Sequence, residues 1–66
     1  MAKIQLNGKK IQLNGAISIE NLLKKYKINK NKVAIELNGI IISKLNLKKK
    51  IKNNDQIEIV HFIGGG

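Results

Sequence analysis

The last four residues, Ile63-Gly64-Gly65-Gly66, are the part of the sequence with the clearest chemical use. They directly follow the strand-like stretch 56–62, so an apolar element leads straight into three glycines. Glycine has no side chain, and a run of it can extend into a narrow channel. The reactive group of such a segment is the carboxylate of Gly66. The alternative is a frayed end without a function, because polypeptide ends are often poorly ordered.

Other residues that could do chemistry are few and form no catalytic group. The sequence has no cysteine, and a single histidine, His61, excludes a multi-histidine zinc centre. We expect His61 to pack as an ordinary strand residue. Ser18 suits the N-cap of a helix better than the role of a nucleophile. Glu36 and Glu58 are expected to point outward and to pair with lysines across strands. We therefore predict no catalytic residue, no metal site and no bound cofactor.

The net charge of +9 comes from thirteen lysines and no arginine. Such a charge can indicate binding to nucleic acid or to an anionic membrane. Arginine, the usual reader of bases, is absent, and Tyr26 and Phe62 are too few aromatic residues to form a stacking surface. Most of the lysines are expected to be solvated. A basic nucleic-acid or ribosome-binding module remains an alternative of a different functional class, and a basic face that docks an acidic protein is another.

The length of 66 residues predicts one small domain with a thin core. No apolar segment of the signal-peptide kind follows Met1. The longest apolar run, Ile40-Ile41-Ile42, is far shorter than the ~20 residues of a membrane span. We expect a soluble, cytoplasmic protein without membrane contact.

Two hairpins are predicted from alternating residues and from Asn-Gly pairs. Stretches 3–7 and 10–13 alternate, and Asn7-Gly8 between them is typical of a type I′ turn. Stretches 33–37 and 40–42 are joined in the same way by Asn38-Gly39. The first hairpin also repeats one pentapeptide, Ile-Gln-Leu-Asn-Gly, at 4–8 and at 11–15.

One helix is predicted over 18–26, between the two hairpins. Ser18 can cap it, and Lys24 and Lys25 suit the negative end of the helix dipole. Its apolar stripe, at positions i, i+3, i+4 and i+7, consists of Ile19, Leu22, Leu23 and Tyr26. Stretch 43–52 is less regular, and we expect three of its residues to reach the core, namely Leu45, Leu47 and Ile51.

A single helix must cover one face of the sheet to bury its stripe. The last strand is the most apolar and belongs in the middle, parallel to the first. The prediction is an α+β fold, a ubiquitin-like β-grasp with a mixed sheet of order 2-1-5-3-4 and one helix. Residues 1–62 would form the domain and residues 63–66 a flexible glycine-rich tail.

The sequence resembles the ThiS sulfur carriers of thiamine biosynthesis, of the MoaD/ThiS superfamily. The resemblance rests on stretch 33–39 (Val-Ala-Ile-Glu-Leu-Asn-Gly), on stretch 54–60 (Asn-Asp-Gln-Ile-Glu-Ile-Val) and on the final Gly-Gly, and it covers essentially all 66 residues. The heavy lysine content and the repeated pentapeptide depart from what we would expect of the family, but neither affects the terminal motif.

This resemblance implies a carrier and not an enzyme. An E1-like, ThiF-like adenylyltransferase would use ATP and Mg²⁺ to adenylate Gly66, and a sulfur donor would convert it to a thiocarboxylate. The carrier would then deliver sulfur to a ThiG-like thiazole synthase. Gly64 would be a spacer, and Gly65 would be required for clearance in the partner's channel.

Partner docking is expected on the sheet face that the helix leaves open. Ile57 and Ile59 should face the helix, so Val60 and Phe62 should face the open side, near Ala34. Ordinary half-buried strand residues would look the same. A small subunit of molybdopterin synthase and a ubiquitin-like protein modifier remain alternatives, because both share the terminal chemistry.

Overall fold

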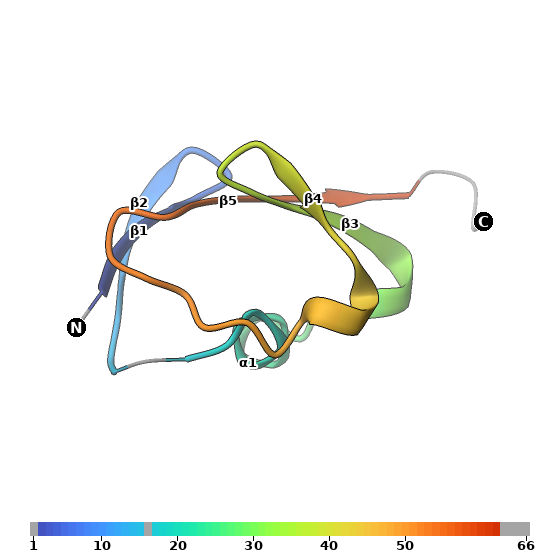
Figure 1. Cartoon of the computed structure of the whole chain (residues 1–66), viewed down its shortest axis with the longest axis horizontal. Helices are drawn as coiled ribbons and strands as arrows, with labels where there is room; N and C mark the ends of the chain where they lie inside the picture. Colours follow the sequence, from blue (N-terminus) through green and yellow to red (C-terminus); the bar gives the residue numbers. More distant parts are fainter. Residues whose placement is uncertain (1, 16, 63–66) are drawn as a thin grey trace.

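The structure is a computed structural model and describes residues 2–15 and 17–62. A mixed five-stranded sheet has the order β2-β1-β5-β3-β4, which confirms the predicted order. Strand β1 is parallel to β5, and the other neighbouring strands are antiparallel. The helix α1 lies across one face of the sheet (Figure 1). The bounds are β1 (Ala2–Leu6), β2 (Lys9–Leu13), α1 (Ile19–Lys25), β3 (Val33–Leu37), β4 (Ile40–Ile42) and β5 (Gln56–His61).

Two tight turns set the register of the hairpins. Asn7 and Gly8 have φ values of 51° and 82°, and Asn38 and Gly39 have 53° and 84°. A type I′ turn requires positive φ at both central residues, and asparagine and glycine tolerate it best. Both turns were predicted from the sequence. They place every second residue of each hairpin on the helix side.

Helix α1 begins and ends at the predicted signals. The Ser18 Oγ accepts a hydrogen bond from the Asn21 amide at 3.1 Å. Lys24 and Lys25 lie in the last turn, as the helix dipole favours. The stripe residues Ile19, Leu22 and Leu23 are buried.

The fourth predicted stripe residue, Tyr26, is 43% exposed. It is the C-cap residue, where the backbone leaves the helical path. A side chain at that position no longer follows the stripe. The prediction that Tyr26 packs in the core is therefore wrong.

The irregular segment between β4 and β5 contributes two of the three expected core residues. Leu47 and Ile51 are buried, whereas Leu45 is 92% exposed. Leu45 lies in a 3₁₀ turn, Lys44–Asn46, which the Ser43 hydroxyl caps by accepting the Leu45 amide. In such a tight turn, residues two apart do not share a face. The expected burial of Leu45 is therefore wrong.

A buried carboxylate fixes the start of β5. The Asp55 carboxylate accepts hydrogen bonds from the Asn38 Nδ2 at 3.0 Å and from the Lys52 amide at 2.8 Å. The Asn38 Oδ1 in turn accepts the Gln56 amide at 2.8 Å. The turn between β3 and β4 is thereby bonded to the first residue of β5.

Asn7 holds the middle of β5 with its side chain. Its amide donates to the Ile57 carbonyl at 2.9 Å, and its Oδ1 accepts the Ile59 amide at 2.7 Å. The backbone turns away from β5 at Gly8, so no backbone carbonyl of β1 can reach Ile59. The Asn7 side chain therefore extends the parallel ladder by one bond and satisfies a backbone donor.

The two edges of the sheet differ in character. Strand β2 carries Lys9 and Lys10, and charged residues protect an edge from pairing with other polypeptides. Strand β4 consists of three isoleucines, of which Ile40 and Ile41 are exposed. Strand β4 is protected from pairing with other polypeptides only by being short.

Replacing Asn7 by glycine tests the bond to β5. Glycine keeps the positive φ but removes the acceptor, which leaves the Ile59 amide unsatisfied. We expect a loss of about 1–3 kcal/mol in the free energy of unfolding, measured by urea denaturation. The control is Asn14→Gly in the repeated pentapeptide, where the side chain makes no hydrogen bond to residues 2–15 and 17–62. Equal losses in the two variants would contradict the role given to Asn7.

Candidate functional site at the end of the central strand

The site begins at β5, which is paired on both sides. Strand β1 bonds to its first half, and β3 pairs with it from Ile57 to His61. One further bond, from the Phe62 amide to the Lys32 carbonyl at 2.9 Å, extends the pairing beyond the strand. The predicted acceptor Gly66, and with it Gly64 and Gly65, lies outside the described residues. The backbone that precedes them is thus held by hydrogen bonds as far as Phe62.

The three residues predicted for docking lie on the open face. Ala34 is the direct cross-strand partner of Val60. Val60 and Phe62 are about half exposed, at 54% and 50%, whereas Ile57 and Ile59 are buried on the helix side. The predicted orientation of β5 is therefore confirmed. The docking role of these residues stays a prediction.

Two carboxylates face each other on the same open face, next to the docking residues. Glu36 on β3 is the direct partner of Glu58 on β5. Among residues 2–15 and 17–62, neither carboxylate has a hydrogen-bond or ion-pair partner. The expectation that they pair with lysines across strands is therefore wrong, since the register places them opposite each other. Like charges at this position destabilise a sheet.

This pair could have been predicted from the strand register but not from residue type. Glu36 and Glu58 have the same strand phase as Ala34 and Val60, so all four must share the open face. The pair also borders a hollow of about 180 Å³. Its other lining residues come from both tight turns and from the start of β5, and include Gly8, Gly39 and Gln56.

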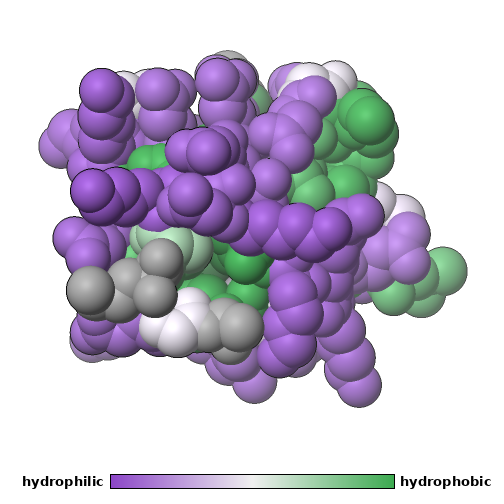
Figure 2. Space-filling view, turned by 60° about the vertical axis from the view of Figure 1, so that its left-hand side comes forward, coloured by the Kyte–Doolittle hydropathy of each residue, from purple (hydrophilic) through white to green (hydrophobic). Residues whose placement is uncertain are grey.

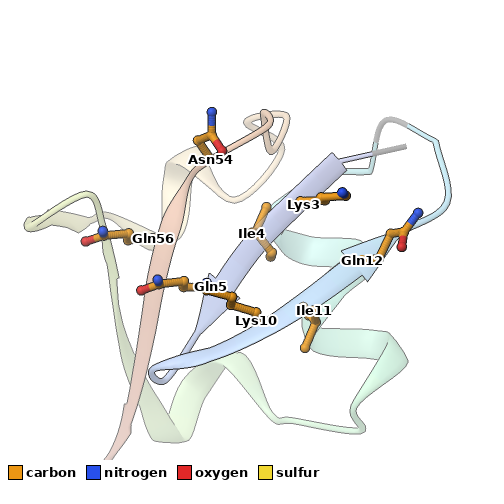
Figure 3. Close-up of a pocket in the computed structure, with 8 residues that line it drawn as sticks. All are labelled: Lys3, Ile4, Gln5, Lys10, Ile11, Gln12, Asn54 and Gln56. Atoms are coloured by element: carbon orange, nitrogen blue, oxygen red, sulfur yellow. The ribbon is translucent and has the colours of Figure 1, made fainter.

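The other half of the open face is polar and carries no carboxylate. Gln5 stands opposite Lys10 of β2 on one side and opposite Gln56 of β5 on the other. Figure 3 shows these side chains around a hollow of about 500 Å³, with Lys3 and Gln12 at its far end. The open face is thus divided into a lysine and amide half over β1, β2 and the start of β5, and an acidic and apolar half over the rest of β5 and β3.

The remaining candidates make no catalytic centre. His61 is exposed at the last position of β5, so the expectation that it packs as an ordinary strand residue is wrong. The hydroxyls of Ser18 and Ser43 both serve as caps. No group of three potential metal ligands exists among the described residues, 2–15 and 17–62.

The surface reflects the lysine content. Seen from the end where β2 lies, it is largely hydrophilic, with small hydrophobic areas between the polar side chains (Figure 2). In the part that the structure describes, no helix has both the length and the apolar character needed to cross a membrane.

Comparison with known proteins identifies the family. The model of the ThiS family matches residues 4–66. The sulfur carrier protein ThiS of Bacillus subtilis is 38% identical over 65 residues, which cover 96% of this chain and 98% of that protein. A thiazole synthase of Magnetococcus marinus is also 38% identical over 65 residues, but these cover 97% of this chain and only 20% of that protein.

The fold leads to the same group of proteins. The crystal structure of the thiamine biosynthesis protein ThiS from Geobacter metallireducens superimposes with a TM-score of 0.82 and 28% sequence identity. The match covers 97% of this chain and 99% of that one. The family model and both kinds of similarity agree, and this chain belongs to the ThiS family.

Proposed function

We propose that this protein transports sulfur for thiamine biosynthesis as a thiocarboxylate on Gly66. The observation that carries the proposal is the match to the ThiS family, which runs through residue 66 and so includes the three glycines. The fold supports it, because β5 is bonded to β1 along its first half, and on the β3 side its hydrogen bonds continue as far as Phe62. A firmly held strand gives a short arm a fixed origin and direction.

The proposed chemistry needs a carboxylate and reach, both of which the tail supplies. An oxygen of Gly66 attacks the α-phosphorus of ATP, and pyrophosphate leaves. Hydrosulfide from the sulfur donor then displaces AMP from the acyl carbon and loses its proton, which leaves a thiocarboxylate. ATP and Mg²⁺ belong to an E1-like activating enzyme. Residues 63–66 extended span roughly 13 Å, enough to enter a buried active site, and glycine at 64 and 65 keeps the arm narrow.

Thiazole synthase is the receiving partner in this proposal. Two thiazole synthases, from Magnetococcus marinus and Paramagnetospirillum magneticum, contain a region similar to almost all of this chain, and that region makes up 20% of each protein. Joining two modules raises their effective concentration for each other, which is useful only when they must meet. Where the carrier and the synthase are separate polypeptides, they must instead bind each other through their surfaces.

The docking surface that we propose is the acidic and apolar half of the open face. It consists of Ala34, Val60 and Phe62 with the carboxylates of Glu36 and Glu58. Exposed apolar residues beside a functional end are typical of a docking site. The facing carboxylates cost stability in the free carrier, and a cationic group of the partner would remove that cost. The lysines of β1 and β2 make the other half of the same face positively charged. This separation of charge would favour one orientation of the carrier on its partner.

Thiocarboxylate formation is tested by intact mass. With an E1-like enzyme, ATP and a sulfur donor, the protein should gain about 16 Da, as one oxygen is replaced by sulfur. The variant that lacks Gly66 should show no gain, although its thermal melting temperature should stay the same, because a short terminal arm adds little to a core. An unchanged mass of the full-length protein, under conditions where an established carrier reacts, would refute the proposal.

The apolar part of the docking surface is tested with the two aromatic residues. Phe62→Ala should weaken binding to a thiazole synthase by about tenfold or more, because buried aromatic anchors dominate interface energies. Tyr26→Ala removes the other aromatic side chain, which lies at the end of α1 with a similar exposure. It should leave the dissociation constant, measured by calorimetry, unchanged. Equal effects of both changes would show that the open face is not the docking surface.

The carboxylate pair predicts opposite changes in stability and binding. Glu58→Gln removes the like-charge contact with Glu36, so the free energy of unfolding should rise by about 0.2–1 kcal/mol. The same change should weaken binding to the synthase by about tenfold, or ~1.4 kcal/mol, through the loss of a charged contact. The control, Glu20→Gln, makes the same charge change in the first turn of α1 and should alter stability slightly and binding not at all. Unchanged binding of Glu58→Gln would remove the pair from the docking surface.

A further inference from the structure

We propose that Asn14 is the site of spontaneous deamidation in this protein and that the fold protects the two other Asn-Gly pairs. The sequence has three such pairs, Asn7-Gly8, Asn14-Gly15 and Asn38-Gly39. Asparagine before glycine is chemically labile, because the glycine nitrogen has no side chain beside it to hinder its attack. The family assignment and the proposed carrier function do not account for this site.

The reaction needs only water. The Gly15 amide nitrogen attacks the Asn14 Cγ, a new N–C bond forms, and the bond between Cγ and Nδ2 breaks with release of ammonia. The amide proton of Gly15 is lost to solvent, and ammonia takes up a proton in leaving. Water then opens the resulting five-membered imide at either carbonyl. The products are aspartate and isoaspartate, and no oxidation or reduction takes place.

Asn7 is held away from this reaction by its bond to β5. Its Oδ1 accepts the Ile59 amide at 2.7 Å, and its own amide donates to Ile57. The Asn7 Oδ1 must leave the Ile59 amide before the nitrogen of Gly8 can reach Cγ. That movement would strip a partly buried donor of its partner, which is costly.

Asn38 is held more firmly still. Its Oδ1 accepts the Gln56 amide, its Nδ2 donates to the buried carboxylate of Asp55, and its amide donates to the Gln56 carbonyl at 2.7 Å. Both ends of the side-chain amide are therefore engaged. Attack by the Gly39 nitrogen would require both bonds to break.

Asn14 has no such restraint. It follows the last residue of β2, its side chain is exposed, and within residues 2–15 and 17–62 it makes no side-chain hydrogen bond. Its carboxamide group is free to rotate toward the Gly15 nitrogen. The glycines themselves do not discriminate between the three sites, since Gly8, Gly15 and Gly39 all have positive φ and open surroundings. The restraint on the asparagine side chain is the difference.

The repeated pentapeptide provides an internal comparison. Asn7 and Asn14 both end the sequence Lys-Ile-Gln-Leu-Asn before a glycine, so the four preceding residues and the following one are identical. Differences in the reactivity of the two sites in the folded protein must then come mainly from tertiary structure. The reactive copy follows the end of β2, which pairs with the start of β1, and β1 runs parallel to β5. The end of β2 therefore lies at the opposite end of the sheet from the end of β5 (Figure 1).

Incubation of the folded protein in mildly alkaline buffer tests the proposal. Intact mass should rise by about 1 Da as an amide becomes an acid, and peptide mapping should place the change at Asn14. We expect deamidation there to be at least about tenfold faster than at Asn7 or Asn38, which corresponds to ~1.4 kcal/mol of barrier. Asn14→Gln should remove this fast reaction. Equal rates at the three sites, or a faster reaction at Asn7 or Asn38, would overturn the proposal.

The same incubation in concentrated urea is the matched control. Without the fold, the Asn7 and Asn14 rates should agree within about twofold, because the local sequence is shared. Persistence of the tenfold difference in urea would show that local sequence, and not the bond to β5, protects Asn7. The Asn7→Asp variant, whose carboxylate can still accept the Ile59 amide, serves as the mass-spectrometric standard for the product at that site.

Discussion

The structure depends on how the central strand is held. Strand β5 has neighbours on both sides, yet its parallel contact with β1 is short, and backbone pairing alone would end where β1 turns away. Side chains supply the missing bonds: Asn7 accepts a hydrogen bond from the Ile59 amide, and Asn38 accepts one from the Gln56 amide. The carboxylate of Asp55, just before β5, bonds to Asn38 and to the Lys52 amide. A small domain has little core with which to hold a strand, so these few polar bonds carry much of the positional restraint.

This restraint links the fold to the proposed chemistry. An arm of small residues can reach a distant active site, but it finds the site only if its base is oriented. Pairing as far as Phe62 fixes the base of the arm. The charge division of the open face orients the domain relative to its partner. The facing carboxylates of Glu36 and Glu58 are easier to understand in this light. In the proposed function the carrier binds and leaves its partners in turn, so it can keep a locally unfavourable contact that a partner relieves.

Local signals in the sequence predicted most of the architecture. Both Asn-Gly turns, the helix with its cap, and the strand order followed from residue types and alternation, and the family assignment and solved relatives agree with them. The predictions failed at the end of the helix, in the irregular segment after β4, and where strands distant in the sequence meet. Tyr26 and Leu45 fit an apolar pattern, but one caps the helix and the other sits in a tight turn. Two other contacts depend on the register between strands that are distant in the sequence: Glu36 opposite Glu58, and the Asn7 side chain on the Ile59 amide. Composition and periodicity carry no information about that register. The glycines of the tail were identified from the sequence, and their role stays a proposal.

The exposed isoleucine edge of β4 has a further consequence for the behaviour of the protein in solution. An uncovered apolar edge is a template for pairing with other polypeptides, and Ile40 and Ile41 offer no charge of their own to prevent it. With a net charge of +9, however, two copies repel each other before their edges can meet. That repulsion acts through solvent and weakens as the Debye length falls to about 3 Å at 1 M salt. The lysines therefore act as a colloidal stabiliser, and the tendency of this carrier to self-associate is coupled to ionic strength.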